Sequence, residues 1–199
     1  MKTGTVARTL VLVALMLNLG VAGVYAQQQN SVKMTFSGTM LATSINLQAG
    51  TVTDDVNLAG DGSLGPFTFR ELHADNLTPQ QPPVSCSTPL FFHVETGAGV
   101  LRFQDGSLLV VKVVKLPEGP EAGICIDLAA GKARLTETYE ITGGTKRLKR
   151  ASGTLTLTAT VIPVLFNASG GAQLLTSTGM FEGTVSGVGR RKEGRDERE

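Results

Sequence analysis

The sequence lacks tryptophan and any large excess of basic charge, and it has only two histidines and two cysteines. Lysine and arginine together number 18, against 17 aspartates and glutamates. A dedicated nucleic-acid-binding protein normally carries a strongly basic face. We therefore expect no nucleic-acid partner.

Short motifs of common catalytic and metal sites are also missing. The chain has no Gly-x-Ser-x-Gly nucleophile elbow, and neither His73 nor His93 has an acid or cysteine at a recognised metal-ligand spacing. One acidic stretch misses the EF-hand spacing, so we interpret it as a polar turn. Its members are Asp54, Asp55, Asn57 and Asp61. We expect no metal and no cofactor, and the sequence favours a protein that is not an enzyme.

The two ends of the chain differ in composition from its middle. Residues 1–26 have a basic start, an apolar run and a Val24-Tyr25-Ala26 ending, which together indicate a cleavable secretory signal peptide. Its apolar run is short for a membrane span, so we expect a secreted chain, periplasmic or extracellular, without stable membrane insertion. Residues 190–199 are almost wholly charged and are predicted to be a disordered tail. Residues 27–189 then form one domain.

Cys86 and Cys125 are the only cysteines. Both would meet an oxidising compartment in a secreted chain, and their spacing is not that of a redox-active C-x-x-C pair. We predict that they form a structural disulfide.

Alternation of apolar and polar residues with a period of two dominates the middle of the chain. In residues 154–161, leucine, alanine and valine alternate with threonine, which predicts a strand with one solvated face. Similar patterns recur at short intervals, and no convincing helical period lies outside the signal. Asp105-Gly106 predicts a tight hairpin, Gly131 and Thr96–Gly99 predict further turns, and the proline-containing segment 74–88 predicts a loop.

The spacing of these strands predicts an all-β fold, namely a single antiparallel β-barrel of about eight strands, with a two-sheet β-sandwich as the alternative. The segment Ile141–Gly153, followed by the threonine-rich strand, resembles allene-oxide-cyclase-like and dirigent-like barrels, and small secreted bacterial proteins of unassigned role. The resemblance implies an eight-stranded barrel. No catalytic residue of those families falls within the matched segment.

Three functions remain open at the level of sequence. A non-catalytic barrel could bind a small apolar ligand or take part in surface interactions, and a cavity for that ligand would be lined by Phe36, Phe69, Phe92, Phe103 and Leu109. A barrel-type isomerase or cyclase for a small hydrophobic substrate would use Glu137 and Tyr139, which share the apolar face of their strand. An adhesive module would associate through an uncovered strand edge.

Overall fold

The computed structural model describes residues 29–189. The predicted signal peptide, residues 1–26, and the predicted charged tail, residues 190–199, therefore lie outside the described residues. No helix within residues 29–189 is long and apolar enough to cross a membrane.

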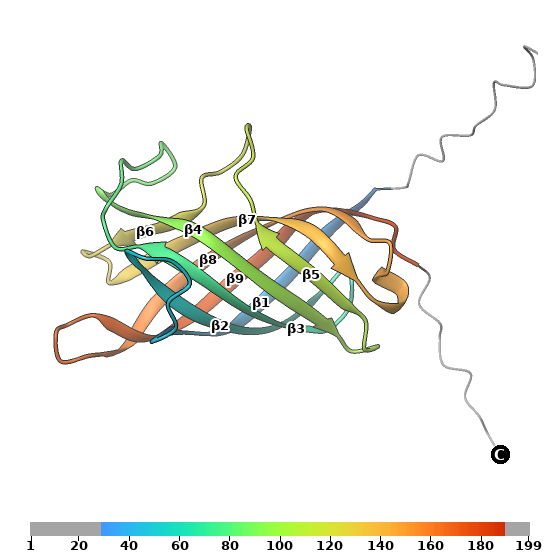
Figure 1. Ribbon diagram of the computed structural model, residues 1–199, viewed down its shortest axis with the longest axis horizontal. Coiled ribbons are helices and arrows are strands. Elements are labelled where there is room, and N and C mark those ends of the chain that lie inside the picture. The colour runs from blue at the N-terminus through green and yellow to red at the C-terminus, as the bar shows by residue number, and fades with distance from the viewer. Residues whose placement is uncertain (1–28, 190–199) are drawn as a thin grey trace, which may run out of the picture.

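Nine strands and one turn of 3₁₀ helix make up the described chain (Figure 1). They are β1 (Asn30–Thr43), β2 (Thr51–Gly62), β3 (Phe67–Asn76), β4 (Leu90–Phe103), β5 (Leu108–Val113), β6 (Gly123–Asp127), β7 (Lys132–Gly144), η1 (Lys146–Leu148), β8 (Ser152–Phe166) and β9 (Ala172–Ser186).

The strands form one antiparallel sheet that closes on itself. Their order is β3-β2-β1-β9-β8-β7-β5-β4, and pairing of β3 with β4 closes the ring of eight. The extra strand β6 pairs with β4 and β7 beyond the end of β5, so β5 and β6 occupy the same gap one after the other. The predicted eight-stranded barrel is thus confirmed.

Strand β8 shows how the sequence pattern produces the core. Leu155, Leu157, Ala159 and Val161 are each at most 2% exposed, and the threonines between them face outward. Burial of such a stripe from every strand supplies the main stabilisation of a closed barrel. The predicted face of this strand is confirmed.

Two predicted turns are wrong. Residues 54–61 belong to β2, and Thr96–Gly99 lies in the middle of β4. In the second segment, Gly97 and Gly99 misled the prediction because they allow close packing against a neighbouring strand rather than a turn. A Cβ on Gly97 would come within 2.8 Å of His73 Cβ and Val113 Cγ2, and a Cβ on Gly99 would overlap the ring of Phe69.

Two of the tight turns have a positive φ at the glycine that the sequence predicted, and a third has it at a residue other than glycine. Gly106 and Gly131 adopt positive φ values of 74° and 62°, as hairpin turns require. The bend after β7 contains Gly143 and Gly144, but the positive φ there is adopted by Lys146, with φ 50°.

Cys86 and Cys125 form the predicted disulfide. It joins the long loop between β3 and β4 to β6, at the end of the barrel where β3 finishes and β4 begins. The β8–β9 hairpin extends beyond the barrel on one side of Figure 1, and it exposes Ile162, Val164, Leu165 and Phe166.

Candidate functional site

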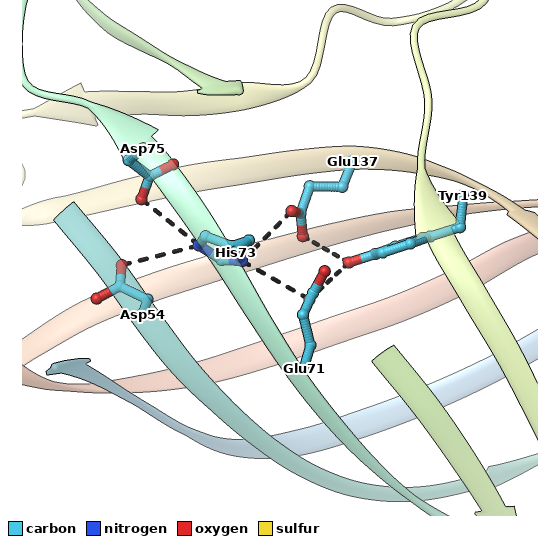
Figure 2. A network of polar contacts seen from close by, with 6 residues as sticks. All are labelled: Asp54, Glu71, His73, Asp75, Glu137 and Tyr139. Carbon is cyan, nitrogen blue, oxygen red and sulfur yellow. Dashed lines mark hydrogen bonds and ion pairs between the residues drawn. The ribbon is translucent and has the colours of Figure 1, made fainter. Parts of the chain in front are cut away.

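A cluster of ionisable side chains lies inside the barrel, among otherwise apolar neighbours (Figure 2). Strand β3 contributes three members through its inward face, and β2 and β7 contribute the others. We call this set the buried acid cluster: Asp54, Glu71, His73, Asp75, Glu137 and Tyr139. Each of the six is at most 8% exposed, and His73, Glu137 and Tyr139 are completely buried.

His73 lies at the centre of the cluster, between two pairs of carboxylates. Its Nδ1 atom faces Glu137 Oε1 at 3.4 Å and Glu71 Oε2 at 3.7 Å. Its Nε2 atom faces Asp75 Oδ2 at 3.5 Å and Asp54 Oδ2 at 3.7 Å. All four distances exceed those of ordinary N–H···O hydrogen bonds.

Tyr139 holds the two glutamates together. Its hydroxyl oxygen lies 2.8 Å from Glu71 Oε2 and 2.6 Å from Glu137 Oε2. One hydroxyl proton can be donated to only one carboxylate at a time. The other carboxyl group satisfies this geometry if it is protonated and donates to the tyrosine oxygen.

Burial and mutual repulsion change the protonation of these groups. Burial raises the pKa of Glu137 to about 8, with a further contribution from the charge of Glu71. Burial also raises the pKa of Asp75 and of Tyr139. Burial acts to lower the pKa of His73, but the carboxylates of Glu137 and Asp75 outweigh it and raise that pKa well above 6.5.

Several polar atoms of the cluster have no hydrogen-bond partner among residues 29–189. They are Glu71 Oε1, Glu137 Oε1, Asp75 Oδ1 and both ring nitrogens of His73. Within the same range, no lysine or arginine forms an ion pair with the four carboxyl groups. Buried polar atoms are normally satisfied, so this cluster is an exception that calls for a functional explanation.

A second candidate site lies on the outside of the barrel. An open hollow of about 1190 Å³ covers the outer faces of β2, β3, β4 and β5. We call it the outer groove. The loop between β1 and β2 contributes Ile45 and Leu47, which are 49% and 43% exposed.

Strand register shows how the floor of the outer groove is built. Leu72 of β3 pairs with Ala98 of β4, and the next outward position of β4, Val100, pairs with Val110 of β5. These four apolar side chains face outward in neighbouring positions on three adjacent strands. Exposed apolar side chains gathered in this way are typical of binding surfaces.

Basic side chains border this apolar floor. Arg102 of β4 and Lys112 of β5 both line the groove, and neither forms an ion pair with another residue in the range 29–189. Arg70 also lines it, but its guanidinium binds Asp55 Oδ2 at 2.8 Å. The groove therefore combines an apolar floor with two cations that have no acidic partner in the described chain.

The residues proposed to line an interior cavity differ in how deeply they are buried. Phe36, Phe69, Phe103 and Leu109 belong to one core cluster, each at most 6% exposed. Phe92 is only half-buried and is not among the buried members of that cluster, although it lies opposite Ile124 of β6, which packs against the cluster. The four core residues are in contact with other buried side chains, including those of Phe67 and Phe181.

Glu137 and Tyr139 do lie together, as their shared strand face predicted. Neither of them lines the outer groove or a smaller hollow of about 290 Å³ at the junction of β5 and β6. Arg70 and Arg102 both point outward from the barrel and are therefore not partners of Glu137.

The buried acid cluster as a unit was not predicted from the sequence. Asp54 and Glu137 are 83 positions apart, so no local spacing connects them. One signal was present, because Glu71, His73 and Asp75 alternate along β3 and must therefore share a face. Three ionisable residues on one face of a strand beginning with Phe67 and Phe69 indicate a polar core.

Comparisons with known proteins find solved structures that align with this chain at low similarity. No family model matches the chain, and no curated protein matches it. Among solved structures, a pterocarpan synthase dirigent protein aligns with TM-score 0.40 and 10% identity, over 82% of this chain and 92% of that one.

Two further structures align more weakly. The Diels–Alderase AbmU from Streptomyces koyangensis has TM-score 0.36 and 11% identity, over 92% of this chain and 82% of that one. A nonspecific heme-binding cyclase of neoabyssomicin biosynthesis has TM-score 0.35 and 11% identity, over 92% and 81%. Alignments at this level carry no argument about function, which must come from the sites themselves.

Proposed function

We propose that this protein is a secreted, non-catalytic β-barrel that binds a small amphipathic molecule, with an apolar body and an acidic group, in the outer groove. One observation carries the proposal: the apolar floor of the groove is bordered by Arg102 and Lys112, which lack an acidic partner in residues 29–189. Ligand sites commonly combine a mostly apolar lining with a few polar groups that orient the ligand.

The packing of the interior supports binding outside the barrel rather than within it. Phe181 stacks against Phe36 and Phe69 at ring-centroid distances of 5.2 Å, and against Phe67 at 6.0 Å. Side chains at these distances fill the space that a ligand would need. A small barrel of eight strands is commonly filled in this way.

The alternative of an isomerase or cyclase requires a substrate beside Glu137 and Tyr139. Both side chains are completely buried, and neither lines the two hollows described above. This arrangement supports binding over catalysis. Secretion is supported by the Cys86–Cys125 disulfide, because such bonds persist in oxidising compartments.

Competition for a fluorescent probe tests the proposed function. Anilinonaphthalene sulfonate has an apolar body and an acidic group, and its emission rises on binding. We expect saturable binding that decanoate displaces and that decyltrimethylammonium, with the same chain and the opposite charge, displaces much less. Equal displacement by both amphiphiles, or no saturable binding, would contradict the proposal.

Variants locate that binding. Arg102→Ala combined with Lys112→Ala should weaken decanoate binding about three- to tenfold, because exposed charge contacts contribute up to about 1 kcal/mol each. Lys33→Ala is the matched control, since this lysine lies on β1 outside the groove and pairs with Glu182. If the groove instead joins two copies of the chain, sedimentation will show a dimer that the double variant disrupts, and the ligand proposal fails.

A further inference from the structure

We propose that the inner side of the buried acid cluster is a binding site for a divalent transition-metal ion of the zinc type, with Glu71, His73 and Glu137 as its ligands. The donor atoms are His73 Nδ1, Glu137 Oε1 and one carboxylate oxygen of Glu71. They lie within 4.8 Å of one another in the fold. Glu71 also lines the outer groove, whereas His73 and Glu137 do not, and the inference does not depend on the proposed function.

Interatomic distances support coordination rather than direct hydrogen bonding. A tetrahedral ion with ligands at 2.0 to 2.2 Å separates neighbouring donor atoms by about 3.3 to 3.6 Å. His73 Nδ1 lies 3.4 Å from Glu137 Oε1 and 3.7 Å from Glu71 Oε2. These separations are too long for good N–H···O hydrogen bonds. They are close to the distance between neighbouring donor atoms around a tetrahedral ion.

The buried polar atoms without hydrogen-bond partners lie at the same proposed site. His73 Nδ1, Glu71 Oε1 and Glu137 Oε1 are all buried, and none has a hydrogen-bond partner among the described residues. No lysine or arginine within residues 29–189 forms an ion pair with either glutamate. A divalent cation would satisfy the three atoms and balance the two glutamate charges, which are costly to bury without a cation.

Neighbouring groups hold the ligands as metal sites require. A histidine that binds an ion through one nitrogen usually donates its other N–H to a carboxylate, which fixes the ring. Here the Nε2 side of His73 faces Asp75 Oδ2 at 3.5 Å and Asp54 Oδ2 at 3.7 Å, so suitable acceptors stand on this side, and an orienting hydrogen bond requires one of them to move closer. Tyr139 bonds to the Oε2 atoms of both glutamates (Figure 2). Glu137 Oε1 is left available, whereas the Glu71 oxygen at 3.7 Å from His73 Nδ1 is the Oε2 atom that Tyr139 also contacts.

The smaller hollow at the junction of β5 and β6 approaches this site at Gly97. The hollow is lined by Val94, Val113 and Glu121 among others. Val113 Cγ2 lies 2.8 Å from the position of a Cβ on Gly97, and Glu71 Oε1 lies 3.1 Å from that position. Val113 and Glu71 are therefore neighbours at this glycine, which has no side chain to separate them.

Titration of the folded chain with Zn²⁺ tests the inference. The protein is first stripped of metal with a chelator, and binding is then measured by calorimetry and by metal content after dialysis. We expect one Zn²⁺ per chain and a higher melting temperature with Zn²⁺. A folded, stripped wild-type chain that retains no Zn²⁺ would overturn the proposal.

Amide variants keep the shape of the site and identify its ligands. Glu71→Gln combined with Glu137→Gln should lower Zn²⁺ affinity more than 100-fold, whereas Asp75→Asn should lower it about 10- to 100-fold, as expected for a group that only orients the histidine. Glu140→Gln is the matched control on the outward face of β7 and should leave affinity unchanged. Wild-type affinity in the glutamate double variant would overturn the assignment.

Discussion

The two halves of the barrel interior differ in chemistry although the same strands build them. Along the inward face of β3, Phe67 and Phe69 are followed by Glu71, His73 and Asp75. The first pair joins an aromatic core centred on Phe181, which contacts four rings at centroid distances of 5.2 to 6.2 Å. The last three form the buried acid cluster. The alternation of a strand therefore fixes which residues face inward, but not whether the interior is apolar.

The two ends of the barrel are also closed by different means. Near the acid cluster, the Cys86–Cys125 disulfide joins the β3–β4 loop to β6. At the aromatic end, the guanidinium of Arg147 covers the ring of Phe103 at 5.2 Å and donates to Asp105 and to the backbone oxygen of Leu64. A covalent link closes the polar end, and packing with hydrogen bonds closes the apolar end.

The largest effect is expected in the aromatic half. Phe181→Ala removes the ring that contacts Phe36, Phe67, Phe69 and Tyr139, and the cavity it leaves should lower the free energy of unfolding by about 3 to 5 kcal/mol. Guanidinium chloride unfolding followed by circular dichroism measures this change. A loss below about 1 kcal/mol would mean that the aromatic half is not packed as described.

Removing the covalent closure of the polar end should cost slightly less. Cys86→Ala combined with Cys125→Ala opens a cross-link between positions 39 apart, for which the chain-entropy treatment gives about 3 to 4 kcal/mol. The same unfolding experiment measures it, with the reduced wild-type chain as control. Equal stability of oxidised and reduced chains would show that the polar end does not depend on the disulfide.

Tyr139 stands between the two halves, and its hydroxyl group belongs to the polar one. Tyr139→Phe keeps the ring contact with Phe69 at 5.9 Å but removes the partner of Glu71 and Glu137. We expect a loss of about 1 to 3 kcal/mol, the cost of leaving buried acceptors unsatisfied. An unchanged unfolding midpoint would show that this hydroxyl does not stabilise the cluster.

The smallest effect is expected at the aromatic end, where Asp105 faces solvent. Partial burial acts to raise the pKa of Asp105, but hydrogen bonds from Ser107 and Arg147 outweigh it and lower that pKa to about 2. A lowered pKa stabilises the folded chain above pH 4, and that stabilisation disappears as the pH falls from about 4 to 2.

Asp105→Asn should therefore destabilise the chain by no more than about 1 kcal/mol at neutral pH, because the pair is near the surface. The difference from wild type should vanish near pH 2. Melting temperatures measured across this pH range test the prediction. A difference that persists unchanged at pH 2 would assign it to packing rather than to the charge of Asp105.

The sequence predicted the barrel well because its evidence is local and repeated. Period-two alternation in 154–161 and the Asp105-Gly106 turn each need only a few neighbouring residues. Gly97 and Gly99 were misread as a turn because their reason is non-local: Phe69 and His73 come from another strand. A glycine inside a strand can mark a close neighbour as readily as a bend.

The candidate sites were harder to predict for the same reason. Glu137 and Tyr139 were found because they share one strand, but their partners Glu71 and His73 come from β3. The outer groove depends on the register of β3, β4 and β5, which brings Leu72, Val100 and Val110 together. Register is set by the closure of the whole sheet and cannot be read from any one segment.

Methyl NMR during a titration with decanoate tests most directly whether ligand binds outside a filled barrel. Val110 and Val111 are adjacent on β5 and point outward and inward, and Leu72 and Leu135 make a similar outward and inward pair. The account predicts saturable shifts for the methyl groups of Val110 and Leu72, with those of Val111 and Leu135 unchanged. Larger shifts for Val111 and Leu135 would place the ligand inside the barrel and contradict the account.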